Sequence, residues 1–276
     1  MSAKPEGDTP RFLAWLYSTP SQQPVLASLC GIEREISASL RPGTDHHVAH
    51  TRLAWWREEC ARCTAGNPVH PLTRELRIQV QQLAPGSLAN SALAGLSGLV
   101  DTATWDLAGA TFERREELAA YCRRWAGAMV APLSSEVAGA ELGAALCELE
   151  LLGRLAADAR SGRLRIPLNE LAQAAVAPEA VATPPWPQGL VVILRGRHQA
   201  LRRQLAAAVA GASPEMQQNA RGLLVWAALA WQASLRAERA LPHPPAASIA
   251  SAAAANWLAW RAARAAARGR RPGWAS

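Results

Sequence analysis

A dense group of charged side chains lies in the segment 147–168, which reads CELELLGRLAADARSGRLRIPL. Four arginines surround one aspartate there, and the five residues are Arg154, Asp158, Arg160, Arg163 and Arg165. Guanidinium groups bind carboxylates and phosphates through paired, charge-assisted hydrogen bonds. The segment therefore predicts either a site for an anionic ligand or a cluster of salt bridges.

A helix has to carry the first part of this segment. Leu149, Leu152 and Leu155 recur at helical spacing. The chain then meets Gly162 and Pro167, which are residue types typical of a helix end. We therefore expect the helix to end at Gly162, so that the arginines gather at its end and in the following turn.

A second set of residues with ligand chemistry is Cys60 and Cys63, preceded by three histidines, His46, His47 and His50. A structural zinc ion needs four converging ligands. The chain has no second Cys-x-x-Cys pair, and the histidines lie several helical turns away. We therefore expect ordinary helix thiols here and no metal site.

Helical periodicity extends over the whole chain, and no strand pattern is present, so the sequence predicts an all-α fold of a single domain. Ser213, Pro214 and Glu215 mark a well-defined helix start, and Gly139 is expected to end a helix. Prolines predict a loop over 176–188. The expected helices cover about 11–18, 25–40, 46–65, 70–83, 88–107 (as one or two helices), 113–137, 190–210, 213–240 and 246–268.

The predicted domain division has three parts. Residues 1–19 are expected to be disordered or to form a short N-terminal helix, residues 20–268 to form the helical domain, and residues 269–276 to form a basic, flexible tail. The tail contains Gly269, Pro272 and Gly273 and has little to bury.

Charge is distributed unevenly along the 276 residues. The formal net charge is +7, and residues 236–276 hold seven arginines against one glutamate. The rest of the chain is therefore near neutral, which argues against nucleic acid as a partner. Arg261, Arg264 and Arg268 share one helix face after Trp257 and Trp260. This face is either a solvated helix or a contact for a membrane surface.

Cellular location is predicted from absences. The five cysteines, an odd number, indicate reduced thiols. The N-terminus has no apolar core of a signal peptide, and no uninterrupted apolar stretch of about 20 residues exists. We expect a cytoplasmic protein that associates at most with the surface of a membrane.

The segment 153–167 resembles a motif of squalene and phytoene synthases that runs R-D-x-x-E-D-x-x-x-G-R-x-Y-x-P. Aligned without gaps, Asp158, Gly162, Arg163 and Pro167 match it. Gly153 falls at the arginine position and Arg165 at the tyrosine position. Arg154 and Ala157 stand where the family has metal-binding carboxylates.

The helix around residues 26–41 looks like the first motif helix of the same family, L-x-A-x-x-x-x-x-R-x-I-D-D-x-x-D. Arg34 and Ile36 match, but the three aspartates correspond to Ser37, Ala38 and Arg41. Three further segments are similar to family segments: RLAWWR at 52–57, HPL at 70–72, and the stretch containing Tyr121 and Gly127. The RLAWWR segment resembles an aspartate-depleted branch that includes the mitochondrial complex I assembly factor.

The resemblance implies an isoprenoid-synthase-like helical bundle around a central cavity. In the family, two facing aspartate clusters hold the Mg²⁺ ions that neutralise a leaving diphosphate. Here the degraded motif positions, Ser37, Ala38, Arg41, Arg154, Ala157 and Asp158, keep one carboxylate, so no cofactor and no metal site are expected. Arginines could bind a diphosphate directly, or could simply pair with nearby acids such as Glu35 and Glu150. The candidates for binding a substrate or an anion are Arg34, Arg41, Arg52, Arg57, Tyr121, Arg154 and Arg163.

Two functions follow from the resemblance. The first is a non-catalytic binding or assembly protein that holds an isoprenoid, a prenyl diphosphate or a protein partner in the former substrate cavity. The second is an active prenyltransferase that condenses two prenyl diphosphates with a rebuilt Mg²⁺ site. Such a site would use remaining acids, namely Glu33, Glu35, Glu148 and Glu150. A third, weaker hypothesis is a peripheral membrane protein that acts through its basic C-terminal helix.

Overall fold

The chain is built from α-helices and short 3-10 helices. The computed structural model describes residues 5, 10–41, 43–83, 87–245, 249–271 and 273–274, and it contains no strand within those ranges, as the all-α prediction requires. In chain order the elements are α1 (Pro10–Tyr17), α2 (Gln23–Ser37), η1 (Ala38–Leu40), α3 (His46–Ala65), α4 (Pro71–Leu83), α5 (Ser87–Leu93), α6 (Gly98–Leu107), α7 (Arg115–Met129), α8 (Val137–Gly153), α9 (Leu155–Arg160), α10 (Leu168–Gln173), η2 (Pro178–Ala182), α11 (Gln188–Gly211), α12 (Pro214–Asn219), α13 (Arg221–Ala240) and α14 (Ile249–Ala266).

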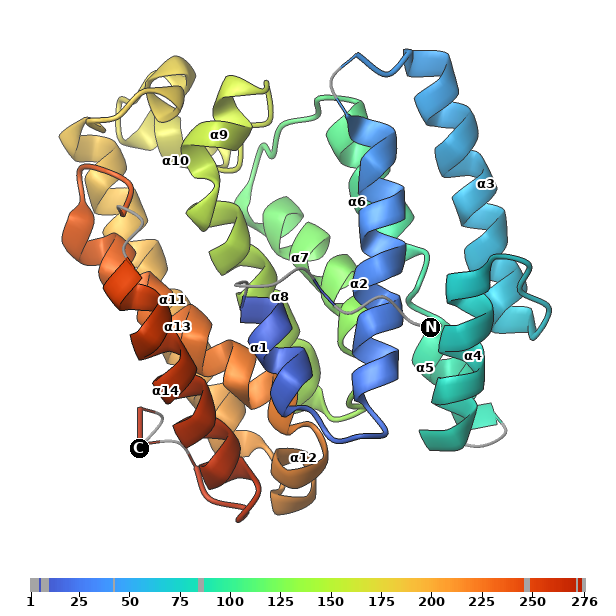
Figure 1. Ribbon diagram of the computed structural model, residues 1–276. Helices are drawn as coiled ribbons and strands as arrows, with labels where there is room; N and C mark the ends of the chain where they lie inside the picture. Colours follow the sequence, from blue (N-terminus) through green and yellow to red (C-terminus); the bar gives the residue numbers. More distant parts are fainter. Residues whose placement is uncertain are drawn as a thin grey trace.

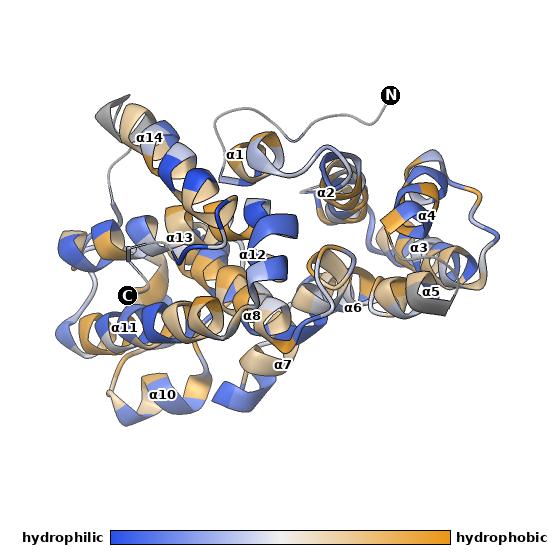
Figure 2. Ribbon diagram, turned by 90° about the horizontal axis from the view of Figure 1, so that it is seen from below, coloured by the Kyte–Doolittle hydropathy of each residue, from blue (hydrophilic) through white to orange (hydrophobic). Residues whose placement is uncertain are grey.

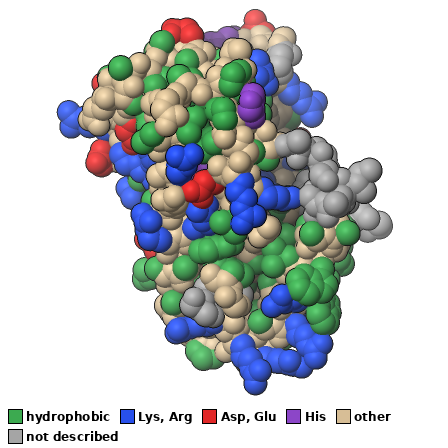
Figure 3. Space-filling model, turned by 90° about the vertical axis from the view of Figure 1, so that its left-hand side faces the viewer, with side chains coloured by type: hydrophobic (Ala, Val, Ile, Leu, Met, Phe, Trp, Pro, Cys, Tyr) green, Lys and Arg blue, Asp and Glu red, His purple; other side chains and the backbone are tan. Residues whose placement is uncertain are grey.

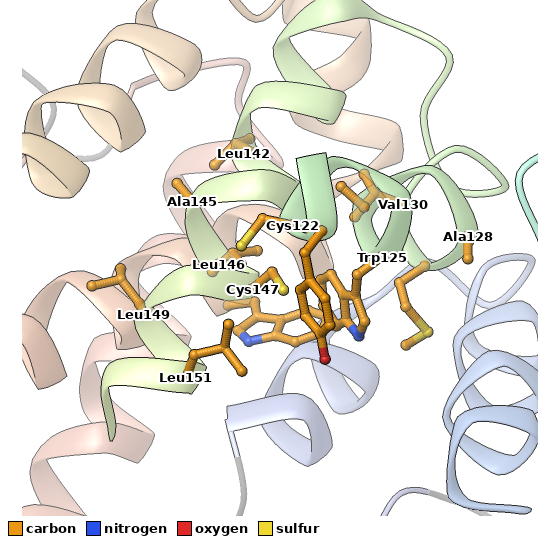
Figure 4. Packing of buried hydrophobic residues seen from close by; sticks show 14 of the residues in the cluster. Cys122, Trp125, Ala128, Val130, Leu142, Ala145, Leu146, Cys147, Leu149 and Leu151 are labelled. Carbon is orange, nitrogen blue, oxygen red and sulfur yellow. The ribbon is translucent and has the colours of Figure 1, made fainter. Parts of the chain in front are cut away.

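Helix α8 lies at the centre of the bundle. Figure 2 shows it between α6 and α7 on one side and α11 and α13 on the other, with the apolar faces of these helices turned inward. Its sequence is apolar on almost every face, which is typical of a helix surrounded by other helices. Figure 4 shows Cys122 and Trp125 of α7 packed against Leu146 and Cys147 of α8.

The directions of α2 and α8 decide at which end of the bundle the two motif segments lie. Helix α2 runs upward in Figure 1 toward η1, and α8 runs upward toward α9, so the two motif segments of the sequence meet at the same end of the bundle. Helices α3, α4 and α5 form a separate group on the outer side of α2 and α6. The bundle thus brings residues near 41 and residues near 154 to one end.

The expected helix over 113–137 is wrong in its second half. Helix α7 ends at Met129, and a turn leads to α8, which begins at Val137. Gly139 was expected to end a helix but lies in the first turn of α8. A Cβ atom there would come within 2.9 Å of the Ser134 hydroxyl oxygen, so the glycine serves close packing against the turn and does not break the helix.

The segment 88–107 forms two helices, α5 and α6, which was one of the two alternatives expected. The separation is explained by backbone contact with α7. A Cβ atom at Gly98 would lie 2.3 Å from the carbonyl oxygen of Arg124, so only glycine permits this approach at the start of α6. Such a contact depends on tertiary packing and leaves no signal in the local pattern.

Two further expected helices are interrupted. The segment 213–240 is divided at Ala220, where α12 ends and α13 begins, and α13 approaches the α1 backbone at Gly222. The helix predicted up to Gly162 is interrupted at Arg154, between α8 and α9. The predicted turn itself is confirmed, since Gly162 has a positive φ of 79°. The predicted start at Ser213 is also confirmed, because its hydroxyl accepts a hydrogen bond from the Met216 amide at 3.0 Å.

The C-terminal part of the chain packs onto the bundle through α14, which lies against α1 and α13. Beyond it, Arg271 donates to the carbonyl oxygen of Ala210 at 2.7 Å, and the Trp274 ring lies 4.9 Å from that of Trp231. Arg271 and Trp274 thus contact the bundle, and the flexibility of the tail stays a prediction. Among the described residues, no helix is both long and apolar enough to cross a membrane.

Candidate functional site

A cavity of about 910 Å³ opens between the helices that carry the two motif segments. Helices α2, α6, α7, α8 and α13 supply most of its wall, and α1 contributes Arg11. Six arginines and four carboxylates line it, so the positive charges exceed the negative ones. These residues are Arg11, Arg34, Arg41, Arg154, Arg163, Arg165, Glu33, Asp106, Glu150 and Asp158.

Arg11 forms the centre of one cluster in the cavity wall. Its guanidinium pairs with Glu33 of α2 and donates to Glu150 of α8 at 3.2 and 2.5 Å. The indole of Trp125 also donates to Glu33 at 2.7 Å, and the guanidinium lies 5.5 Å from the Trp125 ring and 5.2 Å from the Trp226 ring. Burial lowers the pKa of Arg11, but the two carboxylates outweigh burial and raise the pKa above its ordinary value. Arg11 is therefore a permanent cation that neutralises both acids.

Arg165 forms the centre of a second cluster. It donates to Asp106 at 2.6 and 2.9 Å and to Asp158 at 2.8 Å. Arg163 lies 3.6 Å from the other Asp158 oxygen, and the Tyr121 hydroxyl donates to Asp106 at 3.2 Å. Burial, followed by the Asp106 charge, raises the pKa of Tyr121 well above its ordinary value, so Tyr121 stays protonated as a donor. Asp158, the one carboxylate kept from the family motif, is thus held inside a salt-bridge cluster.

These two clusters leave no carboxylate free for Mg²⁺ in the cavity wall. Each of the four lining acids contacts an arginine, and in the described part of the chain no three His, Cys, Asp or Glu side chains are grouped so as to hold a metal ion. Mg²⁺ requires hard oxygen ligands that are not already neutralised by cations. The residues present do not fit the Mg²⁺ cluster that the family resemblance implies.

Three arginines at the end of the cavity where η1 and α9 lie differ from the clustered ones. Arg34, Arg41 and Arg154 are exposed and line the cavity, and their side chains form no hydrogen bond or ion pair with the residues that the structure describes. Ser37 lines the cavity beside them, whereas Ala38 and Ala157 do not line it. We call Arg34, Arg41 and Arg154 the mouth arginines. The alternative of local pairing with Glu150 is not what the structure shows, because Glu150 binds Arg11.

Two other predicted candidates lie away from the cavity. Arg52 and Arg57 are exposed on α3, outside the residues that line the cavity, and Arg57 pairs with Asp101 at 2.9 Å. In the same helix Trp56 is buried, with its ring 4.8 Å from that of His70. Within RLAWWR, only Leu53 and Trp56 are buried, so the segment packs through one face and exposes the other.

The remaining acids and thiols are placed by the structure as follows. Glu148 does not line the cavity and accepts hydrogen bonds from Arg115 at 2.5 and 2.7 Å and from Arg197 at 3.1 Å. Cys60 and Cys63 are buried, and burial raises the pKa of Cys60 to about 12 and that of Cys63 to about 11. Neither thiol is in a form that binds metal readily.

Sequence reasoning missed several residues that shape the site, above all Arg11, Asp106 and His198. Arg11 had one visible signal, because it is the only charged residue in the apolar helix PRFLAWLY. Asp106 and His198 had none, since their partners Arg165 and Ser234 are distant in the chain. Their roles depend on which helices face each other.

The sequence and the fold of this chain are similar to those of known proteins. The sequence profile of the family Squalene/phytoene synthase matches residues 4–261. A crystal structure of a dehydrosqualene synthase in complex with ligand superposes with a TM-score of 0.75 at 14% identity, covering 92% of this chain and 91% of that chain. Squalene synthase HpnC from Alicyclobacillus acidocaldarius superposes with a TM-score of 0.63 at 20% identity, covering 85% and 89%. No curated protein matches the sequence.

At identities this low, the two superpositions establish only a shared fold. The family profile, however, matches nearly the whole chain. The matched span includes both motif segments and every helix that lines the cavity. The chain therefore belongs to the squalene/phytoene synthase family.

Proposed function

We propose that this protein is a non-catalytic member of its family, which binds an anionic isoprenoid, such as a prenyl diphosphate, without Mg²⁺ and without ionising it. One observation carries the proposal: every described acid that lines the cavity is paired with an arginine, whereas the mouth arginines have no acidic partner among the described residues. Among the described residues, the cavity thus has no unpaired anion for a metal and three unpaired cations for a phosphate group.

A Mg²⁺ site and an arginine site act on a diphosphate in different ways. A metal-dependent prenyltransferase uses Mg²⁺ to neutralise the leaving diphosphate, so its site must first attract the metal. Arginines at those positions repel Mg²⁺ but bind phosphate oxygens directly through charge-assisted hydrogen bonds. The volume of about 910 Å³ suits a ligand with a sizeable apolar chain below the charged end.

The proposed role is binding or assembly, as the resemblance to the aspartate-depleted branch with the mitochondrial complex I assembly factor suggests. In that role the cavity would hold the isoprenoid or a segment of a protein partner. The alternative, a prenyltransferase that condenses two prenyl diphosphates, would need a rebuilt carboxylate site. Three of the four acids named for it are engaged: Glu33 and Glu150 bind Arg11, and Glu148 binds Arg115 and Arg197. The fourth, Glu35, is exposed and does not line the cavity.

A membrane surface is a second proposed partner, and α14 carries the observation that favours it. Trp257 and Trp260 are 58% and 44% exposed, and each has an arginine over its ring, Arg261 at 4.6 Å and Arg264 at 5.2 Å. Figure 3, which views the side of the molecule where α11 and α14 lie in Figure 1, shows basic side chains among hydrophobic ones. Exposed tryptophan next to arginine suits the interface of an anionic membrane.

The binding proposal is tested by adding inorganic pyrophosphate with and without Mg²⁺ and measuring thermal unfolding. We expect stabilisation without Mg²⁺, amounting to about 2.7 kcal/mol at a hundred times Kd. The stabilisation should weaken as salt is added and shrink in Arg41→Ala and Arg154→Ala. Arg52→Ala is the matched control, because Arg52 is also exposed but does not line the cavity.

Four results would contradict the proposal. Stabilisation that requires Mg²⁺ would show that a metal site persists. Equal loss in the Arg52→Ala control would show a general charge effect. Product formed from farnesyl diphosphate with Mg²⁺, and abolished by Asp158→Asn, would establish the prenyltransferase alternative. If pyrophosphate and farnesyl diphosphate both fail to stabilise the protein, the ligand class is wrong and a protein partner becomes the favoured occupant.

A further inference from the structure

A chain of buried polar side chains joins α11 to α13 beside the cavity. His198 and Arg202 of α11 both reach Ser234 of α13: His198 Nδ1 lies 3.0 Å from the Ser234 hydroxyl oxygen, and Arg202 Nη1 lies 3.0 Å from the same oxygen. The second Nη of Arg202 binds Glu238, which also accepts a hydrogen bond from Gln199 at 2.7 Å. His198 is 5% exposed and Ser234 is 2% exposed.

The partners fix the direction of these hydrogen bonds. A guanidinium can only donate, so Ser234 Oγ accepts from Arg202. The serine then has one O–H left, and the only acceptor that the described residues offer it is His198 Nδ1. If Nδ1 carried the proton instead, the serine hydrogen would have no acceptor in the described part of the chain, which is costly in a buried site. The arrangement therefore selects the tautomer with Nδ1 bare and the proton on Nε2.

The Nε2–H group of this tautomer is available for a ligand. His198 and Ser234 both belong to the cavity wall, together with Trp226, Ala230 and Ala233 of the otherwise apolar face of α13. No described residue hydrogen-bonds to Nε2. A donor held in one orientation on an apolar wall selects ligands that carry an acceptor at the matching position.

Burial and charge keep this ring uncharged. Burial, followed by the Arg202 charge, lowers the pKa of His198 to about 4, although Glu238 opposes the shift. The imidazole is therefore neutral near pH 7. A neutral donor suits an uncharged oxygen, whereas the phosphate end of a ligand is better served by the mouth arginines.

We infer that His198 is a specificity-determining residue, whose Nε2–H donates to an uncharged acceptor oxygen, a hydroxyl or a carbonyl, on the hydrocarbon chain of the bound isoprenoid. Ser234 and Arg202 are its positioning residues. The inference rests on the proposed function for the presence of an anionic isoprenoid, and it goes further by assigning the ligand to the oxygenated members of that class. A pure hydrocarbon chain would leave the buried donor unpaired.

The tautomer is tested without any ligand, by nitrogen NMR of ¹⁵N-histidine-labelled protein near pH 7. We expect His198 to show an unprotonated Nδ1 and a protonated Nε2, with the signal assigned by its absence in His198→Phe. In Ser234→Ala the preference for this tautomer should weaken while the ring remains in place. A protonated Nδ1 in the wild type would overturn the inference.

The ligand class is tested by Mg²⁺-free titration with farnesyl diphosphate and a series of analogues, each with one hydroxyl or keto group on a successive isoprene unit. One position in the series should bind about fivefold more tightly than farnesyl diphosphate itself, the effect of one neutral hydrogen bond. The gain, taken in each protein as the ratio of its affinity for that analogue to its affinity for farnesyl diphosphate, should vanish in His198→Phe and decrease in Ser234→Ala. Thr102→Val is the matched control: Thr102 lines the same cavity, but its hydroxyl already donates to the Leu99 carbonyl at 3.0 Å, so the gain should persist.

The titrations distinguish a failure of the inference about His198 from a failure of the proposed isoprenoid binding. If farnesyl diphosphate binds and no analogue binds more tightly, the inference about His198 is overturned and the proposed function stands. A gain that survives in His198→Phe also overturns it. If no member of the series binds at all, both proposals fail. Unfolding of each variant is followed by denaturant titration, so that loss of the fold is not mistaken for loss of specificity.

Discussion

The arginines of the cavity fall into two regions with opposite surroundings. In the wall, Arg11 and Arg165 are enclosed by carboxylates and aromatic rings, and Arg165 is only 4% exposed. At the mouth, Arg34, Arg41 and Arg154 are exposed and have no acidic partner among the described residues. The same residue type thus stabilises the fold in one region and remains available for a ligand in the other.

Burial is the physical cause of this difference. A buried charge that loses its partner keeps the full cost of its desolvation, so buried arginines and acids must come in sets. An exposed charge is solvated and screened, so it can remain unpaired at little cost. The contrast explains why Asp158, although it matches the family motif, cannot be counted as a free metal ligand.

The largest expected effect comes from removing Arg165. Arg165→Met should lower the free energy of unfolding by about 3–5 kcal/mol, because Asp106 and Asp158 would be left buried without their shared cation. Arg154→Met, the same change at the mouth, should alter it by less than about 0.5 kcal/mol. Denaturant unfolding of both variants at one pH measures the difference. Equal losses would show that the wall and the mouth do not differ as described.

A second test uses the pH dependence of the free energy of unfolding, to which His198 in the cavity wall should contribute and the mouth arginines should not. The pKa of His198 is about 4 in the folded protein, below its ordinary value of 6.5. As the pH falls, His198 therefore binds its proton in the unfolded chain before it does so in the folded protein. Its contribution to the free energy of unfolding is full above pH 6.5 and is lost on acidification toward pH 4. The lost amount is about 3 kcal/mol.

This contribution is isolated by comparing the pH dependence of unfolding in the wild type and in His198→Phe, since the carboxylates titrate in both. Between pH 6.5 and 4, the free energy of unfolding should fall less steeply in His198→Phe than in the wild type. Arg41→Ala should keep the slope of the wild type, because an arginine does not titrate in this range. Parallel curves for the wild type and His198→Phe would show that the imidazole is not held neutral by burial.

The smallest effect is expected at the outer surface, where a second set of arginines has no acidic partner among the described residues. Arg261→Gln and Arg264→Gln should each weaken binding to phosphatidylserine-containing vesicles by about 1 kcal/mol, as measured by vesicle sedimentation. Arg236→Gln and Arg239→Gln make the same charge change on α13, at exposed positions for which no ring contact is seen, and serve as the control. An equal loss in the control pair would mean that net charge, and not the Trp–Arg face of α14, sets the affinity.

The helical character of the fold and the location of the site could be predicted from particular residues. The spacing of Leu149, Leu152 and Leu155 and the turn at Gly162 place the charged segment correctly at a helix end. The expectation that Arg41 and Arg154 share one cavity agrees with the structure. Helix boundaries were less predictable, since Gly139 and Gly98 serve contacts between helices that the local sequence does not reveal.

The sequence by itself determined which charges exist: Ser37, Ala38, Arg41, Arg154 and Ala157 stand where the family resemblance places carboxylates. The tertiary structure decided which of the remaining charges are free. Arg11 lies far from Glu150 in the chain, and Asp106 lies far from Arg165, so no local pattern reveals that these residues pair. Pairing depends on distances of a few ångströms in a dry interior, and only the packing of α1, α6 and α8 creates them.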